Sequence, residues 1–197
     1  MTFKLGLTGS IGMGKSTTAK LFAENGCAVW DADAAVHRLY AKGGAAVAPI
    51  GKVFPSAIVH DAVSRDRLKS LIDKDPNALK KIESIVHPLV GEDRAAFLSD
   101  TGTDVTVLDI PLLFETGADA QMDATVCVTV SPETQRARVM ERGTMIEEQF
   151  QAILAKQLPD AEKRARADYV VVTDTLEHAR AQVQDILNDI QNRQTHA

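Results

Sequence analysis

The chain has 197 residues, of which 45% are hydrophobic, so it can bury a core and is expected to form one domain with insertions. Its 22 basic and 27 acidic residues give a formal net charge of -5, which excludes a global positive field that would collect nucleic acid or anionic membrane. No segment approaches the about 20 apolar residues of a membrane span, and we find no targeting signal. Cys27 and Cys127 lie in apolar surroundings, which predicts small buried strand residues in a reducing cytoplasm rather than a disulfide framework.

Short runs rich in β-branched residues alternate with longer amphipathic stretches along the chain. The expected strands are Phe3–Thr8, Ala28–Trp30, Val105–Leu108, Thr125–Val130 and Tyr169–Thr173. Strands that alternate with helices predict an α/β protein with a parallel sheet.

Two long stretches between these strands are expected to be helical. Residues 34–100 contain no convincing strand, and Ser64 and the Asp75-Pro76 pair are suited to opening helices, so we expect a helical insertion there. Residues 132–167 gather basic side chains despite the acidic total, which predicts a mobile cationic lid. The lid cations are Arg136, Arg138, Arg142, Lys156, Lys163, Arg164 and Arg166. After about Asn192 we expect a frayed tail.

The segment Gly9-Ser10-Ile11-Gly12-Met13-Gly14-Lys15-Ser16 matches G-x-x-x-x-G-K-[ST] in full, between an expected strand and a helix from Thr17 to Asn25. Glycines let the backbone wind closely around phosphate oxygens, and amides at the helix N-terminus supply partial positive charge. Lys15 is expected to neutralise the β- and γ-phosphates, and the Ser16 hydroxyl is expected to bind Mg²⁺. The sequence therefore predicts a nucleotide-binding P-loop.

Two other classes of P-loop protein lack their signatures here. A GTPase switch needs an Asn-Lys-x-Asp specifier and an Asp-x-x-Gly segment, and neither is present. A DNA-translocating or remodelling ATPase would be longer and would usually have a strand that ends in paired acidic residues. The corresponding strand here ends Leu108-Asp109-Ile110-Pro111, so a small-molecule kinase is the favoured class.

The second expected strand ends in two acidic residues, Asp31 and Asp33, and the carboxyl ends of parallel strands face the ligand crevice. One of these carboxylates could take or orient the proton of an acceptor hydroxyl during attack on the γ-phosphate. Capping of the following helix, Ala34–Ala41, explains Asp33 equally well. Spacing alone leaves both roles open.

Several further blocks occur in the order and spacing of dephospho-CoA kinases, and the chain resembles that family over nearly its whole length. Besides the P-loop, these blocks are Asp31-Ala32-Asp33 with His37, Ile85-Val86-His87-Pro88-Leu89, Asp109-Ile110-Pro111-Leu112-Leu113-Phe114-Glu115, Ser131-Pro132-Glu133-Thr134-Gln135 with Arg138 and Arg142, and Ala167-Asp168-Tyr169-Val170.

The resemblance implies a P-loop NTPase fold like that of nucleoside monophosphate kinases, with a five-stranded parallel sheet flanked by helices. The implied core comprises residues 1–33, 101–135 and 168–197, with a helical CoA-binding insertion at about 34–100 and a lid at about 136–167. The implied reaction converts ATP and 3′-dephospho-CoA into ADP and CoA with Mg²⁺, the last step of coenzyme A synthesis. No nucleic acid, membrane or obligate protein partner is expected.

The resemblance also implies roles for single residues. Asp33 becomes the catalytic base, and Lys15, Arg138 and Arg142 become the catalytic cations. The ATP phosphates are held by Gly12, Met13, Gly14, Lys15, Ser16 and Thr17, and the acceptor substrate contacts Asp33, His87 and Leu112.

Some signals keep two interpretations. Asp109 could hold Mg²⁺-bound water or cap the turn that follows it. His87 precedes a proline, which predicts a turn, with a role in packing or in contact with the substrate. Arg136 and Arg166 could be only a solvated face, and Trp30, Tyr40 and Phe54 favour core positions.

The chain departs from the family pattern after the last strand, where Thr173-Asp174-Thr175 replaces the usual Asn and Gly near the adenine site. Gly143 stands where an acidic or amide residue often follows the lid arginine. Another small-molecule kinase, or a nucleotide-dependent switch protein without transferase activity, are the competing functions.

Overall fold

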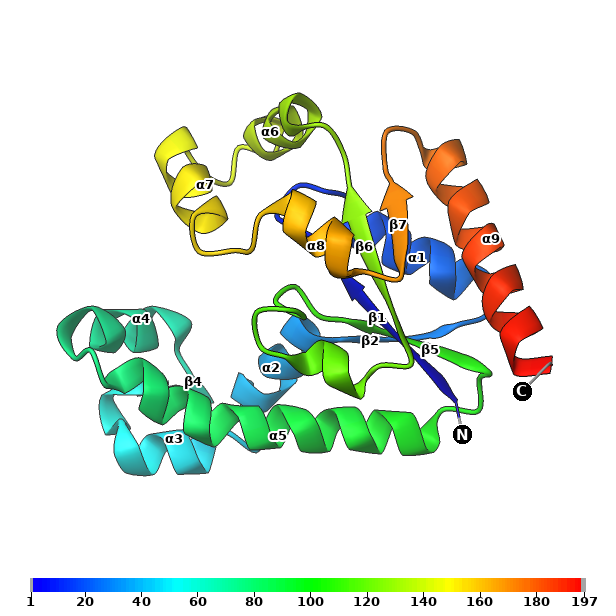
Figure 1. Cartoon of the computed structure of the whole chain (residues 1–197). Coiled ribbons are helices and arrows are strands. Elements are labelled where there is room, and N and C mark those ends of the chain that lie inside the picture. The colour runs from blue at the N-terminus through cyan, green and yellow to red at the C-terminus, as the bar shows by residue number, and fades with distance from the viewer. Residues whose placement is uncertain (1, 196–197) are drawn as a thin grey trace. The chain divides into compact units, whose positions relative to one another are not determined.

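A five-stranded parallel sheet with the strand order β2-β5-β1-β6-β7 forms the centre of the computed structural model, which describes residues 2–195 (Figure 1). The expected strands are confirmed, and their ends differ from the expectation by one residue at most. The strands are β1 Phe3–Thr8, β2 Ala28–Asp31, β5 Val105–Asp109, β6 Ala124–Thr129 and β7 Tyr169–Val172.

Two helices cover one face of this sheet: α1, Lys15–Glu24, and α9, Leu176–Thr195. Leu5 and Leu7 alternate along β1 with Gly6 and are fully buried in the core that these helices complete. Each such side chain contributes about 1.5–3 kcal/mol to folding through removal of apolar surface from water. The expected frayed tail is wrong as far as Thr195, because α9 continues to that residue.

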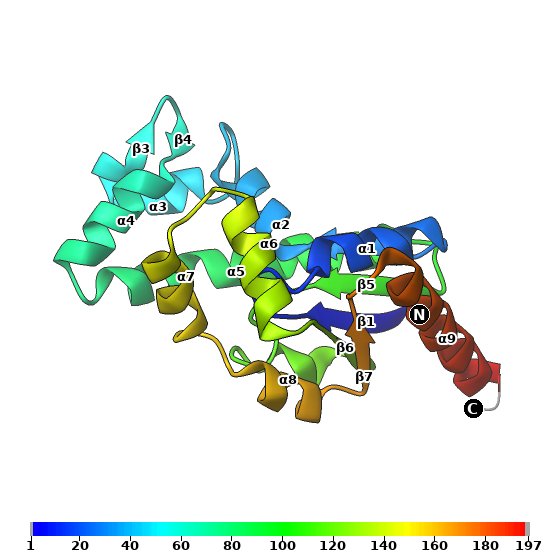
Figure 2. The same ribbon diagram turned by 90° about the horizontal axis from the view of Figure 1, so that it is seen from above.

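The opposite face of the sheet is packed tightly at Gly6. A Cβ atom on Gly6 would lie 2.8 Å from Met122 Cγ and 2.9 Å from Leu113 Cδ2, so the segment after β5 lies directly on the strand backbone. Helix α8, Asp160–Arg166, packs on β6 on the side away from α1 (Figure 1 and Figure 2). The P-loop strand is thus held from both faces.

The chain divides into two compact units, one formed by residues up to Val29 together with those from Thr101 onward, the other by Trp30–Asp100. The second unit has its own buried cluster, which includes Leu39, Ile50 and Val86, and Tyr40 and Phe54 pack against it. Its helices are α2 Ala32–Tyr40, α3 Val47–Val53, α4 Arg65–Lys74 and α5 Ala78–Asp100. Ser64 caps α4 as expected.

Asp93 on α5 connects three parts of the second unit. Its carboxylate accepts hydrogen bonds from Trp30 Nε1 at 2.8 Å and from Arg38 Nη2 at 2.6 Å. The hydrogen bond from Arg38 lowers the pKa of Asp93, against a smaller opposing effect of burial. Trp30 is buried, which confirms its expected core position.

The turn expected at His87 is wrong, because α5 continues through Pro88. A proline removes one helical hydrogen bond and disfavours helical geometry in the residue before it. Burial of Ile82 and Val86 on the same helix outweighs that local preference. His87 itself is exposed on α5, so packing does not explain it.

The expectation of no strand within residues 34–100 is also wrong, because β3, Ile58–Val59, pairs with β4, Ala62–Val63. The connecting His60 and Asp61 have φ values of 51° and 62°, a left-handed turn geometry. Strands of two residues without an Asn-Gly turn leave almost no sequence signal.

Candidate functional site

The P-loop follows β1 and ends at Gly14, which precedes α1 with φ of 93°, a conformation that favours glycine. No side chain caps α1. The amide groups of its first turn are therefore available to an anion, which suits a nucleotide phosphate. Ser16 and Thr17 are exposed on that turn, where their hydroxyls can meet a bound nucleotide.

Lys15 forms an ion pair with Asp109 at the end of β5. The Asp109 carboxylate is 3% exposed and the Lys15 side chain 16% exposed, so water screens their attraction only partly. Asp109 thereby holds the lysine amine beside the loop before any phosphate arrives. This contact was not foreseen among the two interpretations of Asp109.

Helix α6, Pro132–Glu141, packs directly on the P-loop. Gln135 Nε2 donates to the carbonyl oxygen of Ile11 at 2.7 Å. A Cβ atom on Gly12 would lie 2.6 Å from Val139 Cγ2, so only glycine fits beneath this helix. One face of the first part of the expected lid, with the buried Gln135 and Val139, therefore supports the P-loop.

Arg138 and Arg142, which we paired as lid cations, differ in their surroundings. Arg138 lies in α6 and donates both to the hydroxyl and to the carbonyl oxygen of Thr173. Arg142 lies at the C-terminal end of α6 and is exposed, and its guanidinium forms no hydrogen bond or ion pair within residues 2–195. Of these two arginines, Arg142 is therefore the one whose guanidinium is not bound to another described residue.

Arg136 and Arg166 are both exposed, as the interpretation of a solvated face requires, and each also forms an ion pair on that surface. Arg136 pairs with Glu147 at the start of α7, Glu147–Leu154, at 2.9 Å. Arg166 pairs with Asp119 at 3.2 Å and lies over the Phe114 ring at 4.6 Å from its centre.

Lys163, also counted among the lid cations, is fully buried on α8 and is not a surface charge. Its amine lies 2.8 Å from Glu115 Oε1 and donates to the carbonyl oxygen of Pro111 at 3.3 Å. The same Glu115 oxygen accepts from the Leu158 amide at 3.0 Å. These bonds tie the chain before α8 to the segment that follows β5.

Asp31 and Asp33 occupy different positions at the end of β2. Asp31 caps α2, since its carboxylate accepts from the Ala34 amide at 2.9 Å. The interpretation of Asp33 as the cap is therefore wrong, because α2 begins at Ala32 and Asp33 lies in its first turn. The Asp33 side chain is exposed. Leu112, in the segment after β5, is 41% exposed although it is apolar.

Sequence reasoning named Gln135, Thr173 and Lys163 but missed the bonds that they make. All three make bonds to residues distant in sequence, and nothing local indicates those partners. The usable signals were the family block that contains Gln135 and the departure from the family pattern at Thr173.

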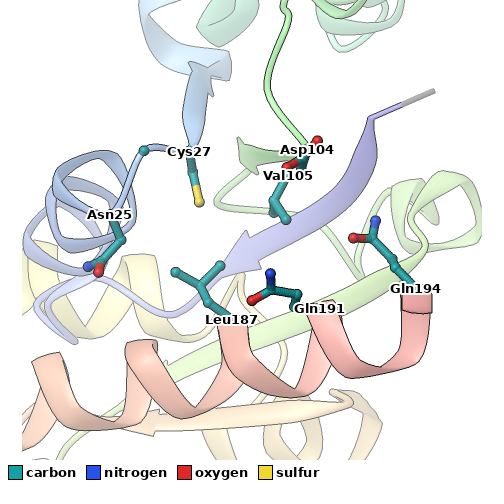
Figure 3. A pocket seen from close by; sticks show the side chains of 8 residues that line it. Asn25, Cys27, Asp104, Val105, Leu187, Gln191 and Gln194 are labelled. Atoms are coloured by element: carbon teal, nitrogen blue, oxygen red, sulfur yellow. The ribbon is translucent and has the colours of Figure 1, made fainter. Parts of the chain in front are cut away.

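A hollow of about 200 Å³ lies at the end of the sheet opposite the P-loop, beside the starts of β2 and β5 (Figure 3). Figure 3 shows the Cys27 thiol beside it, and burial raises the pKa of this thiol to about 11. The residue precedes β2 and is half-buried, so its expected place in a strand is wrong, whereas Cys127 is buried in β6. Because the P-loop follows the carboxyl end of β1, this hollow is separate from the nucleotide site.

Comparisons with known proteins agree on one family. Residues 3–178 match the family model described as dephospho-CoA kinase. A dephospho-CoA kinase of Ruegeria pomeroyi is 66% identical over 197 residues, which is 100% of both chains. One of Cereibacter sphaeroides is 59% identical over 188 residues, 95% of each chain.

Solved structures agree with the fold. TT1252 from Thermus thermophilus has a TM-score of 0.86 at 32% identity, with 95% of this chain and 97% of that chain covered. A dephospho-CoA kinase from Campylobacter jejuni has a TM-score of 0.71 at 22% identity, with 98% and 100% covered.

Replacement of Lys163 by methionine is expected to lower the free energy of unfolding by about 3–5 kcal/mol at neutral pH, because the Glu115 side chain, only 16% exposed, loses its cation. Denaturant unfolding followed by circular dichroism measures this change. Arg180→Met is the matched control, since it breaks the exposed Arg180–Glu24 pair and is expected to cost less than about 1 kcal/mol.

The decrease in the free energy of unfolding caused by Lys163→Met is also expected to be smaller in acid. Burial alone would raise the pKa of Glu115, but the hydrogen bond from Lys163 and two backbone amides lower it on balance. A carboxyl group whose folded pKa is depressed stabilises the fold above its unfolded pKa and loses that effect as pH falls. The difference in free energy of unfolding between the native protein and Lys163→Met should therefore become smaller below about pH 4. An equal cost at all pH values, or a cost no larger than that of Arg180→Met, would contradict this assignment.

Proposed function

Because the chain belongs to the dephospho-CoA kinase family, we propose that the P-loop with Lys15, the carboxylate of Asp33, and the lid residues Arg138 and Arg142 carry out that family's reaction. The chain phosphorylates the ribose 3′-hydroxyl of dephospho-CoA with ATP and gives CoA and ADP, the last step of coenzyme A biosynthesis. The observation that carries this conclusion is a match over the whole chain, which a P-loop shared with another kinase or a switch protein would not give.

The ATP phosphates are bound by the loop from Gly12 to Thr17. The uncapped first turn of α1 directs backbone amides at these phosphates. When ATP binds, the Lys15 amine leaves Asp109 and pairs with the β- and γ-phosphates instead. This exchange leaves the buried Asp109 carboxylate close to the bound nucleotide.

Mg²⁺ is the metal that suits these groups. The exposed Ser16 hydroxyl and the phosphates would hold it, with Asp109 on one of its waters, because hard oxygen donors are the ligands that Mg²⁺ prefers. When bound, it neutralises charge on the β- and γ-phosphates. Between residues 2 and 195 no cluster of three or more His, Cys, Asp or Glu offers a separate metal site.

Asp33 is the base in this proposal. Its carboxylate is exposed just after the carboxyl end of β2, and capping of α2 falls to Asp31 instead. A free carboxylate there can accept the proton of the 3′-hydroxyl as the hydroxyl oxygen attacks the γ-phosphorus in line. His87 and Leu112, both exposed, are proposed contacts of the acceptor.

The larger parts of the chain receive corresponding roles. Residues 34–100 hold dephospho-CoA. The lid, residues 136–167, closes over ATP through its part between α6 and α8, so that Arg142 meets the charge that develops on the transferred phosphoryl group. We place the enzyme in the cytoplasm, because both cysteines are free as in a reducing compartment. No helix in the described part of the chain has the length and apolar character of a membrane span.

The acceptor atom is tested with an analogue of dephospho-CoA that lacks the ribose 3′-hydroxyl. With ATP and Mg²⁺ the natural acceptor is expected to yield CoA, identified by chromatography and mass, whereas the 3′-deoxy analogue should inhibit competitively without phosphorylation. Phosphorylation of the analogue would place the transfer at another atom.

Asp33→Asn is expected to lower kcat by about 100-fold or more and leave ATP affinity near normal, because only the proton acceptor is lost. Asp31→Asn is the matched control, because asparagine caps helices as well as aspartate does, and its kcat should stay near that of the native enzyme. Steady-state ADP release measures both variants. Equal kcat values for the two would refute the assignment of the base.

Arg142→Ala is expected to lower kcat about 10-fold or more with little change in thermal stability, because its exposed guanidinium forms no bond within the described residues and acts only on transition-state charge. Arg136→Ala, which breaks the pair with Glu147, provides the comparison on the same helix. A normal kcat for Arg142→Ala would remove this residue from the reaction.

A further inference from the structure

The hydroxyl of Thr173, directly after β7, contacts the P-loop and α6 at the same time. It donates to the carbonyl oxygen of Met13 at 2.6 Å, and it accepts from Arg138 Nη1 at 3.0 Å. A second nitrogen of Arg138 donates to the Thr173 carbonyl oxygen. Thr173 is 6% exposed, so water competes little for these bonds.

Thr173 also lies against Gly14. A Cβ atom on Gly14 would be 2.8 Å from Thr173 Oγ1 and 3.0 Å from its Cβ. The peptide between Met13 and Gly14 is therefore fixed by contact on one side and by a hydrogen bond at its carbonyl oxygen. This peptide immediately precedes Lys15.

The direction of this peptide matters for anion binding. In a trans peptide the C=O and N–H bonds point in opposite directions. Because the Met13 carbonyl points at Thr173, the Gly14 N–H points away from it. Gln135 does the same two peptides earlier in the loop, since it holds the Ile11 carbonyl and so sets the direction of the Gly12 N–H.

We propose that Thr173 is a positioning residue for phosphoryl transfer, which sets the Gly14 N–H toward the ATP phosphates and holds Arg138 beside the same peptide. The inference rests on the proposed binding of ATP by this loop. Thr173 acts through the loop and through Arg138 and is not itself a catalytic group. This role gives a physical meaning to the position where the chain departs from its family's Asn-Gly pattern.

Thr173→Val keeps the shape of the side chain but leaves the Met13 carbonyl without its donor. We expect kcat/KM for ATP to fall about 5-fold to 100-fold, the range for one buried polar group left unpaired, while KM for dephospho-CoA stays within about 2-fold. Thr173→Ser restores the hydroxyl and should recover most of the loss. Calorimetric titration with ADP and Mg²⁺ should show weaker binding for Thr173→Val alone.

Thr125→Val is the matched control for a merely structural effect. Thr125 is also a buried threonine, bonded to Asp168 at the start of β6, far along the strand from the P-loop. The Thr125→Val enzyme should be less stable than the native enzyme, with kcat/KM for ATP and the affinity for ADP unchanged. In an Arg138→Met background, Thr173→Val should cost less than it does alone, because the two residues share one network.

The outcomes separate this inference from the proposed function. If the native enzyme phosphorylates dephospho-CoA but Thr173→Val has normal ATP parameters, or if Thr173→Ser is no better than Thr173→Val, the positioning role is overturned and the function stands. If the native enzyme does not act on dephospho-CoA, the calorimetric binding of ADP still tests Thr173.

Discussion

A loop can hold phosphate through its N–H groups only if its carbonyl groups have partners elsewhere, because each peptide unit presents both. In this chain three carbonyls of the loop have such partners. The Ile11 carbonyl accepts from Gln135, that of Met13 from Thr173, and that of Gly14 from the amide and hydroxyl of Thr18. The arrangement of α6 and of the chain after β7 follows from this requirement.

The second constraint concerns charge. Several cations that look alike in the sequence are distinguished by what they bind: Lys163 neutralises Glu115 in the interior, and Arg138 is held on Thr173. Lys15 pairs with Asp109, a partner that it can exchange for phosphate because both lie at the end of the sheet where nucleotide is expected. Arg142 keeps its guanidinium exposed. An acidic protein can in this way present a local cationic site for ATP.

Sequence reasoning was successful where the signal is local. The P-loop, the strands of the sheet and the cap of α4 at Ser64 each depend on residues within a few positions of one another. It failed where distant residues decide. The preference of His87 for a turn was overridden by the burial of Ile82 and Val86, and the roles of Gln135, Thr173 and Lys163 depend on partners far along the chain. The sequence could not distinguish a catalytic base from a helix cap at Asp33, because the residue that caps α2 depends on where the helix begins. The helix begins two residues earlier than expected, so Asp31 is the cap.

The most direct test of the account is steady-state ADP release by the purified chain with ATP and Mg²⁺, in parallel reactions with dephospho-CoA, AMP, adenosine, shikimate or no acceptor. We expect dephospho-CoA alone to stimulate ADP release well above the rate without acceptor, and CoA to accumulate in an amount equal to the ADP. Stimulation by another acceptor, or ADP release without CoA, would contradict it.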